Sequence, residues 1–150
     1  GYLGSSAHSC RCTPDQIHRY QAKLSGPLMD RIDLHVEVPN LAHADLLNAT
    51  AGESTQSIRT RCDAARARAI ERQGSSNMAL QGQAIDQHIL LEPDALKFLN
   101  VAASRLGWSA RGTHRALKVA RTIADLAGAQ YTEVAHLAEA MQYRRNPGTL

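Results

Sequence analysis

Aromatic side chains are scarce in this sequence. They make up 4% of the 150 residues, whereas hydrophobic residues as a whole make up 43%. A core is therefore possible, but it has to be built mainly from Ala, Leu, Ile and Val. Because alanine favours helices and allows them to pack closely, this composition predicts a mainly α-helical fold.

Long apolar runs are missing as well. No stretch reaches the roughly 18 apolar residues of a membrane span, and Gly1 does not open the charged segment and apolar run of a signal peptide. Three cysteines are an odd number, and Cys10 and Cys12 are almost adjacent, which argues against a secreted disulfide scaffold. We therefore expect a cytoplasmic protein that does not contact a membrane. The missing initiator Met also predicts a fragment of a longer protein.

The clearest helix signal covers residues 109–128. Ser109 is a favourable N-cap, and Gly128 tolerates the left-handed conformation that ends many helices. Between them, apolar residues recur at helical spacing and form one face: Ala116, Leu117, Ala120, Ile123, Ala124 and Ala127. One face of this helix is therefore expected to pack into a core.

Charged residues occupy other faces of the same helix. Arg111, Arg115 and Lys118 follow the i, i+4, i+7 spacing and form a basic stripe. This stripe is either solvated or faces an anion, and the net charge of +3 permits a phosphate-bearing partner. Arg121 and Asp125 can pair at i, i+4, for a few tenths of a kcal/mol.

Further helix signals are spread over the chain. Thr13 and Gln16 flank Pro14 in a capping box, and Thr132 is expected to cap the last helix. The sequence predicts helices over residues 13–24, 28–32, 54–73, 93–106 and from 132 onward, whereas residues 83–91 are ambiguous and could form a short helical turn. These ranges divide the chain into the edge of a larger domain (1–39), a linker (40–53) and a helical bundle (54–150).

One segment has the pattern of a strand. Apolar and polar residues alternate from Ile32 to Val38, and Pro39 ends the alternation. A lone strand has to pair with another, and the chain offers no partner. We therefore expect its sheet to lie upstream of Gly1.

Two segments carry candidate ligands. His8, Cys10 and Cys12 form a His-x-Cys-x-Cys pattern that could hold zinc, although zinc takes four ligands and one is missing. The alternative is a loop with two reduced thiols. The helix over 54–73 carries five arginines, of which Arg59 and Arg66 are candidate DNA contacts, although most such arrays are solvated faces. Its expected inner face is Ile58, Cys62, Ala65 and Ala69.

The sequence also resembles a known family. Leu24-Ser-Gly-Pro-Leu-Met-Asp-Arg-Ile-Asp-Leu34 looks like the end of an AAA+ ATPase core of the magnesium-chelatase type, and residues 109–126 resemble the sensor-2 helix of its C-terminal lid. Gly1-Tyr-Leu-Gly4 and Cys10-Arg-Cys-Thr-Pro14 support the same resemblance, which covers essentially the whole chain. It implies a small helical bundle, the lid, preceded by a remnant of the α/β core with one strand.

The resemblance implies roles for three arginines. Arg31 matches the arginine finger that reaches the ATP of the neighbouring subunit, and Arg111 matches the sensor-2 arginine, with Arg115 beside it as a nucleotide contact. The plain alternatives are that Arg31 pairs with a neighbouring aspartate and that Arg111 is a surface residue. A first-turn arginine opposes the helix dipole, however, which is unfavourable unless an anion is present.

The resemblance also marks what this chain lacks. It has no Gly-x-x-x-x-Gly-Lys-Ser/Thr phosphate loop and no acidic pair for magnesium, so alone it should not hydrolyse ATP. The implied parent binds ATP and magnesium, forms a ring that is expected to be a hexamer, and moves DNA by branch migration during natural transformation. In the family a Cys-Pro-Cys precedes the cysteines found here, so only half of an implied zinc site is present. The alternatives are a stand-alone basic DNA-binding module and the motor subunit of a metal chelatase.

Overall fold

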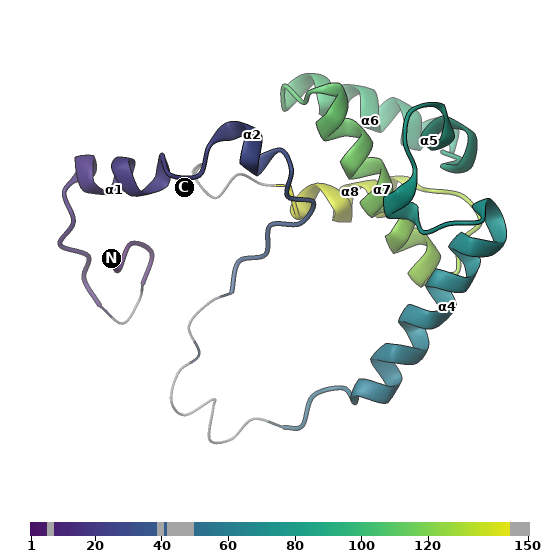
Figure 1. Cartoon of the computed structure of the whole chain (residues 1–150), viewed down its shortest axis with the longest axis horizontal. Coiled ribbons are helices and arrows are strands. Elements are labelled where there is room, and N and C mark those ends of the chain that lie inside the picture. The colour runs from purple at the N-terminus through teal and green to yellow at the C-terminus, as the bar shows by residue number, and fades with distance from the viewer. Residues whose placement is uncertain (6–7, 39–40, 42–49, 145–150) are drawn as a thin grey trace. The chain divides into compact units, whose positions relative to one another are not determined.

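The computed structural model describes residues 1–5, 8–38, 41 and 50–144 (Figure 1). The chain divides into two compact units, Gly1–Gly52 and Glu53–Arg145, and each is described by itself. The described residues are mainly helical, as the composition predicts. None of their helices is long and apolar enough to cross a membrane.

The first unit contains two short helices. Helix α1 (Pro14–Gln21) begins at the predicted capping box, in which the Thr13 side chain accepts from the Gln16 N–H and the Gln16 side chain accepts from the Thr13 N–H. Helix α2 (Gly26–Met29) begins two residues earlier than predicted, because Ser25 caps it. Neither helix buries a residue.

The predicted strand is not present. The backbone from Ile32 to Val38 is irregular, and Val36 and Val38 are 66% and 83% exposed. A strand is stabilised by hydrogen bonds to a neighbouring strand, yet the one β-type pairing among the described residues is an isolated bridge between Leu91 and Thr132. The alternation of side chains is real, but the described residues offer no sheet to which this segment adds.

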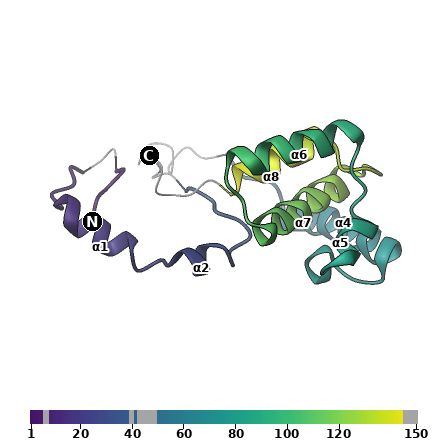
Figure 2. The same cartoon turned by 90° about the horizontal axis from the view of Figure 1, so that it is seen from above.

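The second unit is a helical bundle arranged around α7 (Figure 2). Helix α7 packs against α4, α5, α8 and a 3₁₀ turn, η1, and α8 also packs against α6. The elements are α4 (Thr55–Gln73), η1 (Asn77–Ala79), α5 (Gln83–His88), α6 (Pro93–Arg105), α7 (Ala110–Ala127) and α8 (Val134–Gln142). Helix α7 therefore has the central place that its apolar face predicts.

Alanine dominates the packed interior of this unit, as predicted. Leu117, Ile85 and Leu137 are among the larger buried side chains. The fully inaccessible alanines are Ala95, Ala116, Ala120, Ala124 and Ala140. Small side chains allow α7 to approach its neighbours closely, so a chain with few aromatic residues still builds a dense core.

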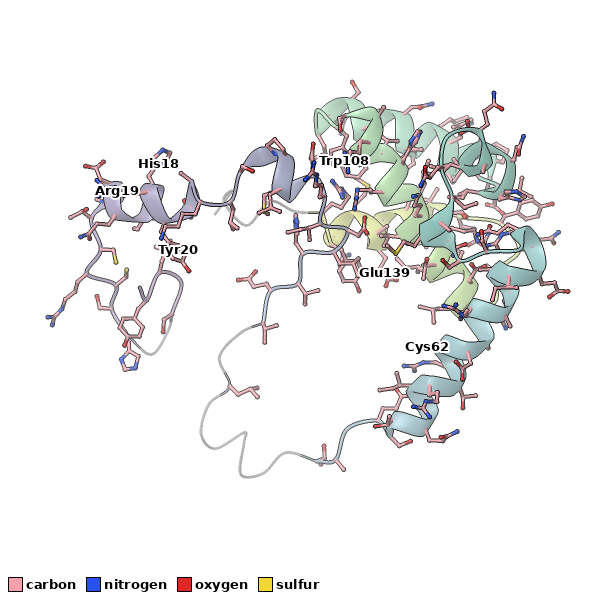
Figure 3. All side chains as sticks on the ribbon, in the orientation of Figure 1. His18, Arg19, Tyr20, Cys62, Trp108 and Glu139 are labelled. Atoms are coloured by element: carbon pink, nitrogen blue, oxygen red, sulfur yellow. The ribbon has the colours of Figure 1, made fainter. Side chains whose placement is uncertain are left out.

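Helix α4 departs from the predicted inner face. Only Ala65 and Ala69 are buried, whereas Ile58 is 42% exposed and Cys62 is exposed. The N-terminal half of α4 extends beyond the helix against which its C-terminal half packs, and Cys62 lies on that half (Figure 3). The residues have the predicted spacing but no surface to cover them.

The start of α8 also differs from the prediction. Glu133, not Thr132, is its N-cap. Thr132 is instead fully buried, and its N–H donates to the Leu90 carbonyl oxygen at 2.8 Å. It therefore ties the loop before α8 to the segment before α6.

Candidate functional site

The first turn of α7 presents an arginine to solvent. Ser109 caps the helix, because its hydroxyl accepts from the Gly112 N–H at 3.1 Å. Arg111 stands two residues after the cap and is exposed. The turn has no acidic residue, and no Asp or Glu occurs in the sequence between Asp94 and Asp125. The positive end of the helix dipole and a fixed cation therefore coincide here.

A second arginine lies at the same turn. Arg144 follows the end of α8, and its guanidinium carbon is 5.9 Å from the centroid of the Trp108 ring. A Cβ on the buried Gly112 would lie 3.6 Å from Arg144 Nη2 and 3.7 Å from Trp108 Cβ. The indole packs against the hydrophobic core, and its residue immediately precedes the cap (Figure 3).

The predicted basic stripe divides into separate roles. Arg111 is exposed and Arg115 is half-buried one turn later. Lys118, the third member, donates from Nζ to the Met78 carbonyl oxygen at 3.1 Å. Lys118 thus holds η1 against α7, and the exposed part of the stripe lies at the helix start.

The other end of α7 contains a buried ionic network. Asp125 accepts from Arg72 Nη1 and Nη2 at 2.7 and 2.9 Å, and from Arg121 Nη2 and Nε at 2.9 and 3.2 Å. Asn77 Nδ2 also donates to it at 2.8 Å. The side chains of Asp125 and Arg121 are each 1% exposed, and that of Arg72 is 22% exposed. The sequence predicts only the weak i, i+4 pair within this network.

Backbone carbonyl groups complete the network. Arg68 Nη1 donates to the Asp125 carbonyl oxygen at 2.7 Å. Arg121 donates to the carbonyl oxygens of Ala129 and Gln130 at 2.6 and 2.9 Å. These carbonyl groups lie at and just beyond the C-terminus of α7, where partial negative charge favours cations. They help to balance the Arg72 and Arg121 guanidinium groups, which share the Asp125 carboxylate, and the nearby Arg68.

The network sets the ionisation of its acid. Burial alone would raise the pKa of Asp125, but hydrogen bonds from Arg72 and Asn77 and the charge of Arg121 together hold that pKa below its ordinary value. Burial lowers the pKa of the Arg121 guanidinium, and Asp125 opposes this shift. The network is therefore charged at neutral pH, and it fastens α4 and η1 to α7.

The five arginines of α4 consequently do not form one uniform face. Arg68 and Arg72 point to α7, and Arg61 pairs with Glu53 at 2.9 Å. Arg59 and Arg66 are exposed, and neither pairs with a carboxylate among the described residues. The two candidate DNA contacts are thus the α4 arginines that neither contact α7 nor pair with Glu53.

The first unit holds the remaining candidates. Arg31 is exposed just after α2, and its N–H donates to the Leu28 carbonyl oxygen at 2.9 Å. Cys10 and Cys12 are free and half-buried. Backbone N–H groups of Cys12 and Tyr2 lower the pKa of the Cys10 thiol. No group of three possible metal ligands, including His8, forms among the described residues, so zinc binding stays a prediction.

Comparison with known proteins identifies the family. The family described as "Magnesium chelatase, subunit ChlI C-terminal" matches residues 52–144, and "Magnesium chelatase, subunit ChlI" matches residues 1–46. The chain belongs to the ChlI-like magnesium-chelatase family. The resemblance noted in the sequence is thereby confirmed.

Curated relatives agree with this ChlI-like assignment. The chain is 43% identical over 135 residues to the competence protein ComM of Haemophilus influenzae, which covers 89% of the chain and 26% of the relative. It is 42% identical over 136 residues to the YifB protein of Salmonella typhimurium, covering 89% and 27%. A Mycobacterium bovis protein is 35% identical over 140 residues, covering 91% and 28%. The chain thus spans about a quarter of the length of these relatives.

Proposed function

We propose that the second unit is the lid of a ring-shaped AAA+ ATPase and that Arg111 senses the bound nucleotide. The observation that carries this proposal is the exposed Arg111 on a helix start that has no acidic residue. A cation at the positive end of a helix is unfavourable unless an anion is close. The γ-phosphate of ATP is such an anion, and the ChlI-like family supports this choice.

The physical chemistry of phosphoryl transfer suits an arginine. Negative charge gathers on the phosphate oxygens as the bond breaks, and prearranged donors that meet this charge lower the barrier. A guanidinium stays protonated and donates through a planar fork that matches phosphate geometry. Arg115, half-buried one turn behind, adds positive potential to the same surface.

In this proposal Arg31 acts on the neighbouring subunit. It is exposed beyond the short helix α2, as a residue that reaches across an interface has to be. An arginine supplied in trans raises the turnover of related nucleotide hydrolases by roughly 10³ to 10⁵. The proposal requires a ring, which we expect to be a hexamer in the cytoplasm. ATP and magnesium would bind chiefly to the phosphate loop of the whole protein, which this chain lacks.

The proposed substrate of the motor is DNA. The relative from Haemophilus influenzae is named a competence protein, and DNA movement during natural transformation fits that name. Arg59 and Arg66 are the proposed phosphate contacts, because both are exposed on α4 and neither pairs with a carboxylate among the described residues. Any zinc site would need ligands beyond Cys10 and Cys12.

The test is ATP turnover by the whole protein, including the region that carries the phosphate loop. Arg111→Ala and Arg31→Ala should each lose most of the turnover at saturating ATP and still assemble. Arg105→Ala, an exposed arginine at the end of α6, is the matched control and should keep wild-type turnover. Full activity of Arg111→Ala would reject the sensor role, and full activity of Arg31→Ala would reject the finger.

A second candidate function is a stand-alone DNA-binding module. The N-terminal half of α4, which carries the exposed Arg59, favours it. If it is correct, the 150-residue chain alone should bind duplex DNA with an affinity that falls steeply with salt, since bound phosphates release counterions. Arg59→Ala/Arg66→Ala should then reduce the salt dependence. Absence of binding at low salt would leave the lid as the better account.

A further inference from the structure

We propose that Arg144 and Trp108 are positioning residues for Arg111: the guanidinium of Arg144, held over the indole, fastens the first turn of α7 to the end of α8. This inference rests on the proposed sensor role of Arg111. It gives a role to the segment that follows α8. Three observations on different elements support it.

The first observation is where Arg144 is held. Its backbone N–H donates to the Met141 carbonyl oxygen at 3.1 Å, so the residue continues the last turn of α8. A cation is favourable at that C-terminal end of α8. Its side chain nevertheless reaches the start of α7, where the helix dipole repels it. The Trp108 ring, 5.9 Å from the guanidinium carbon, offers one compensating attraction, since the face of an indole attracts cations.

The second observation is how Trp108 is fixed. The ring packs against the core, and the Trp108 N–H donates to the Ala103 carbonyl oxygen of α6 at 3.0 Å. Trp108 immediately precedes the Ser109 cap. Its position therefore sets where α7 begins, and with it the direction in which Arg111 leaves the helix two residues after the cap.

The third observation is the buried glycine next to Arg111. Gly112 leaves room for the Arg144 guanidinium, whose Nη2 would lie 3.6 Å from a Cβ at this position. The other atoms nearest this position are Ser109 Oγ and Trp108 Cβ, at 3.5 and 3.7 Å. The first turn of α7 and the residue after α8 therefore meet at Gly112, and Arg111 stands beside the contact.

The contact itself is tested first in the 150-residue chain. Trp108 is the only Trp in the sequence, so its fluorescence reports this site alone. Arg144→Ala should shift its emission to longer wavelength, because water replaces the guanidinium over the ring. Arg144→Lys should largely preserve the emission, since an ammonium also binds the indole face, and Arg105→Ala should not change it. An unchanged spectrum for Arg144→Ala would overturn the proposal.

The positioning role is tested by a double-mutant cycle in the whole protein. Arg144→Ala should lower turnover at saturating ATP about fivefold, a loss that lies within the range of one cation–π contact. Arg144→Lys should restore most of it. If Arg144 acts through Arg111, the double variant Arg111→Ala/Arg144→Ala should be no slower than Arg111→Ala alone.

The outcomes separate this inference from the proposed function. Losses that multiply in the double variant would show that Arg144 acts independently of Arg111, and wild-type turnover of Arg144→Ala would show that it does not act at all. Either result overturns the inference and leaves the sensor role intact. Wild-type turnover of Arg111→Ala would instead remove the proposed function, and the positioning role with it. Thermal unfolding of each variant, measured in parallel, identifies any loss that comes from misfolding.

Discussion

Replacing Asp125 with Asn should strongly destabilise the helical bundle. The carboxylate accepts five hydrogen bonds from Arg72, Arg121 and Asn77, and its side chain is 1% exposed. The amide has the same shape but no charge, and its NH₂ group would face donors. Removing one partner of a buried ion pair costs about 3–5 kcal/mol, because the other partner stays buried without its counter-charge. Two guanidinium groups are affected here, so we expect a value near the upper end.

The size of this loss can be set against the stability of the unit. A domain the size of Glu53–Arg145 has a free energy of unfolding of roughly 5–14 kcal/mol. A loss of about 3 kcal/mol or more should therefore lower the melting temperature by at least about 12 °C. Circular dichroism during thermal and urea unfolding of the 150-residue chain measures this.

A matched control comes from the exposed ion pair between Arg61 on α4 and Glu53, which precedes the helix. Arg61 and Glu53 are 2.9 Å apart, but their side chains are 57% and 41% exposed. Glu53→Gln should therefore change the free energy of unfolding by less than about 1 kcal/mol. The reasoning would be refuted if Asp125→Asn were as mild as this control, since burial is the difference on which the argument depends.

Three further predictions concern acid, helix propensity and thiol exposure. The pKa of Asp125 is lowered in the folded state, so its contribution to stability is complete above its unfolded pKa of about 3.9 and is lost as pH falls through the lower folded value. Below pH 4 the wild type should therefore lose more stability than Asp125→Asn. The free energy of unfolding of both proteins, measured as a function of pH, checks this. Gly112→Ala should raise the free energy of unfolding by about 0.5–1 kcal/mol, because alanine is the better helix former and its Cβ would meet only ordinary contacts. A lower free energy of unfolding, measured in urea, would show that the added methyl group displaces Arg144. Cys62 should react with a thiol reagent at the rate of an exposed cysteine in the folded chain, because α7 does not cover it. Slow reaction would show that Cys62 is buried on the inner face, as the sequence predicts.

Local signals predicted several helix ends correctly because the causes of these ends are local. The Thr13 capping box and the Ser109 cap each satisfy backbone N–H groups within four residues. Gly128 ends α7 in the left-handed conformation for which glycine is suited. Such features need no knowledge of the rest of the fold, so the sequence pattern was sufficient for them.

The failures share the opposite property. Ile32–Val38 has the alternation of a strand, but alternation does not supply the neighbouring strand that would pair with it. Ile58 and Cys62 have the spacing of an inner face, but spacing does not say how far α7 extends alongside α4. In each case the residue pattern defines a surface, and a separate segment decides whether that surface is covered.

The ionic network around Asp125 shows the same limit of prediction from sequence. Arg121 and Asp125 are four residues apart, which predicts a weak pair. The neighbouring residues contained a further signal. Leu117, Ala120 and Ala124 place this pair at the edge of the apolar face, where packing against another helix would bury both side chains. Arg72, 53 residues away from Asp125 along the chain, could not be identified as the third member without the fold. What the sequence cannot give is long-range pairing.

The position of this network bears on the proposed sensor. The network fixes the C-terminal end of α7, and Trp108 and Arg144 fix the N-terminal end of the same helix. Between the two ends, Leu117 and Ala120 pack into the core. A helix fixed at both ends and along its middle moves as a rigid body, so a force on Arg111 would be transmitted to α4 through Asp125 and to α8 through Arg144. Asp125→Asn in the whole protein should therefore weaken the effect of Arg111→Ala on turnover, beyond the loss explained by unfolding at the assay temperature. Equal effects of Arg111→Ala in both backgrounds would show that the sensor acts without the rest of the helix.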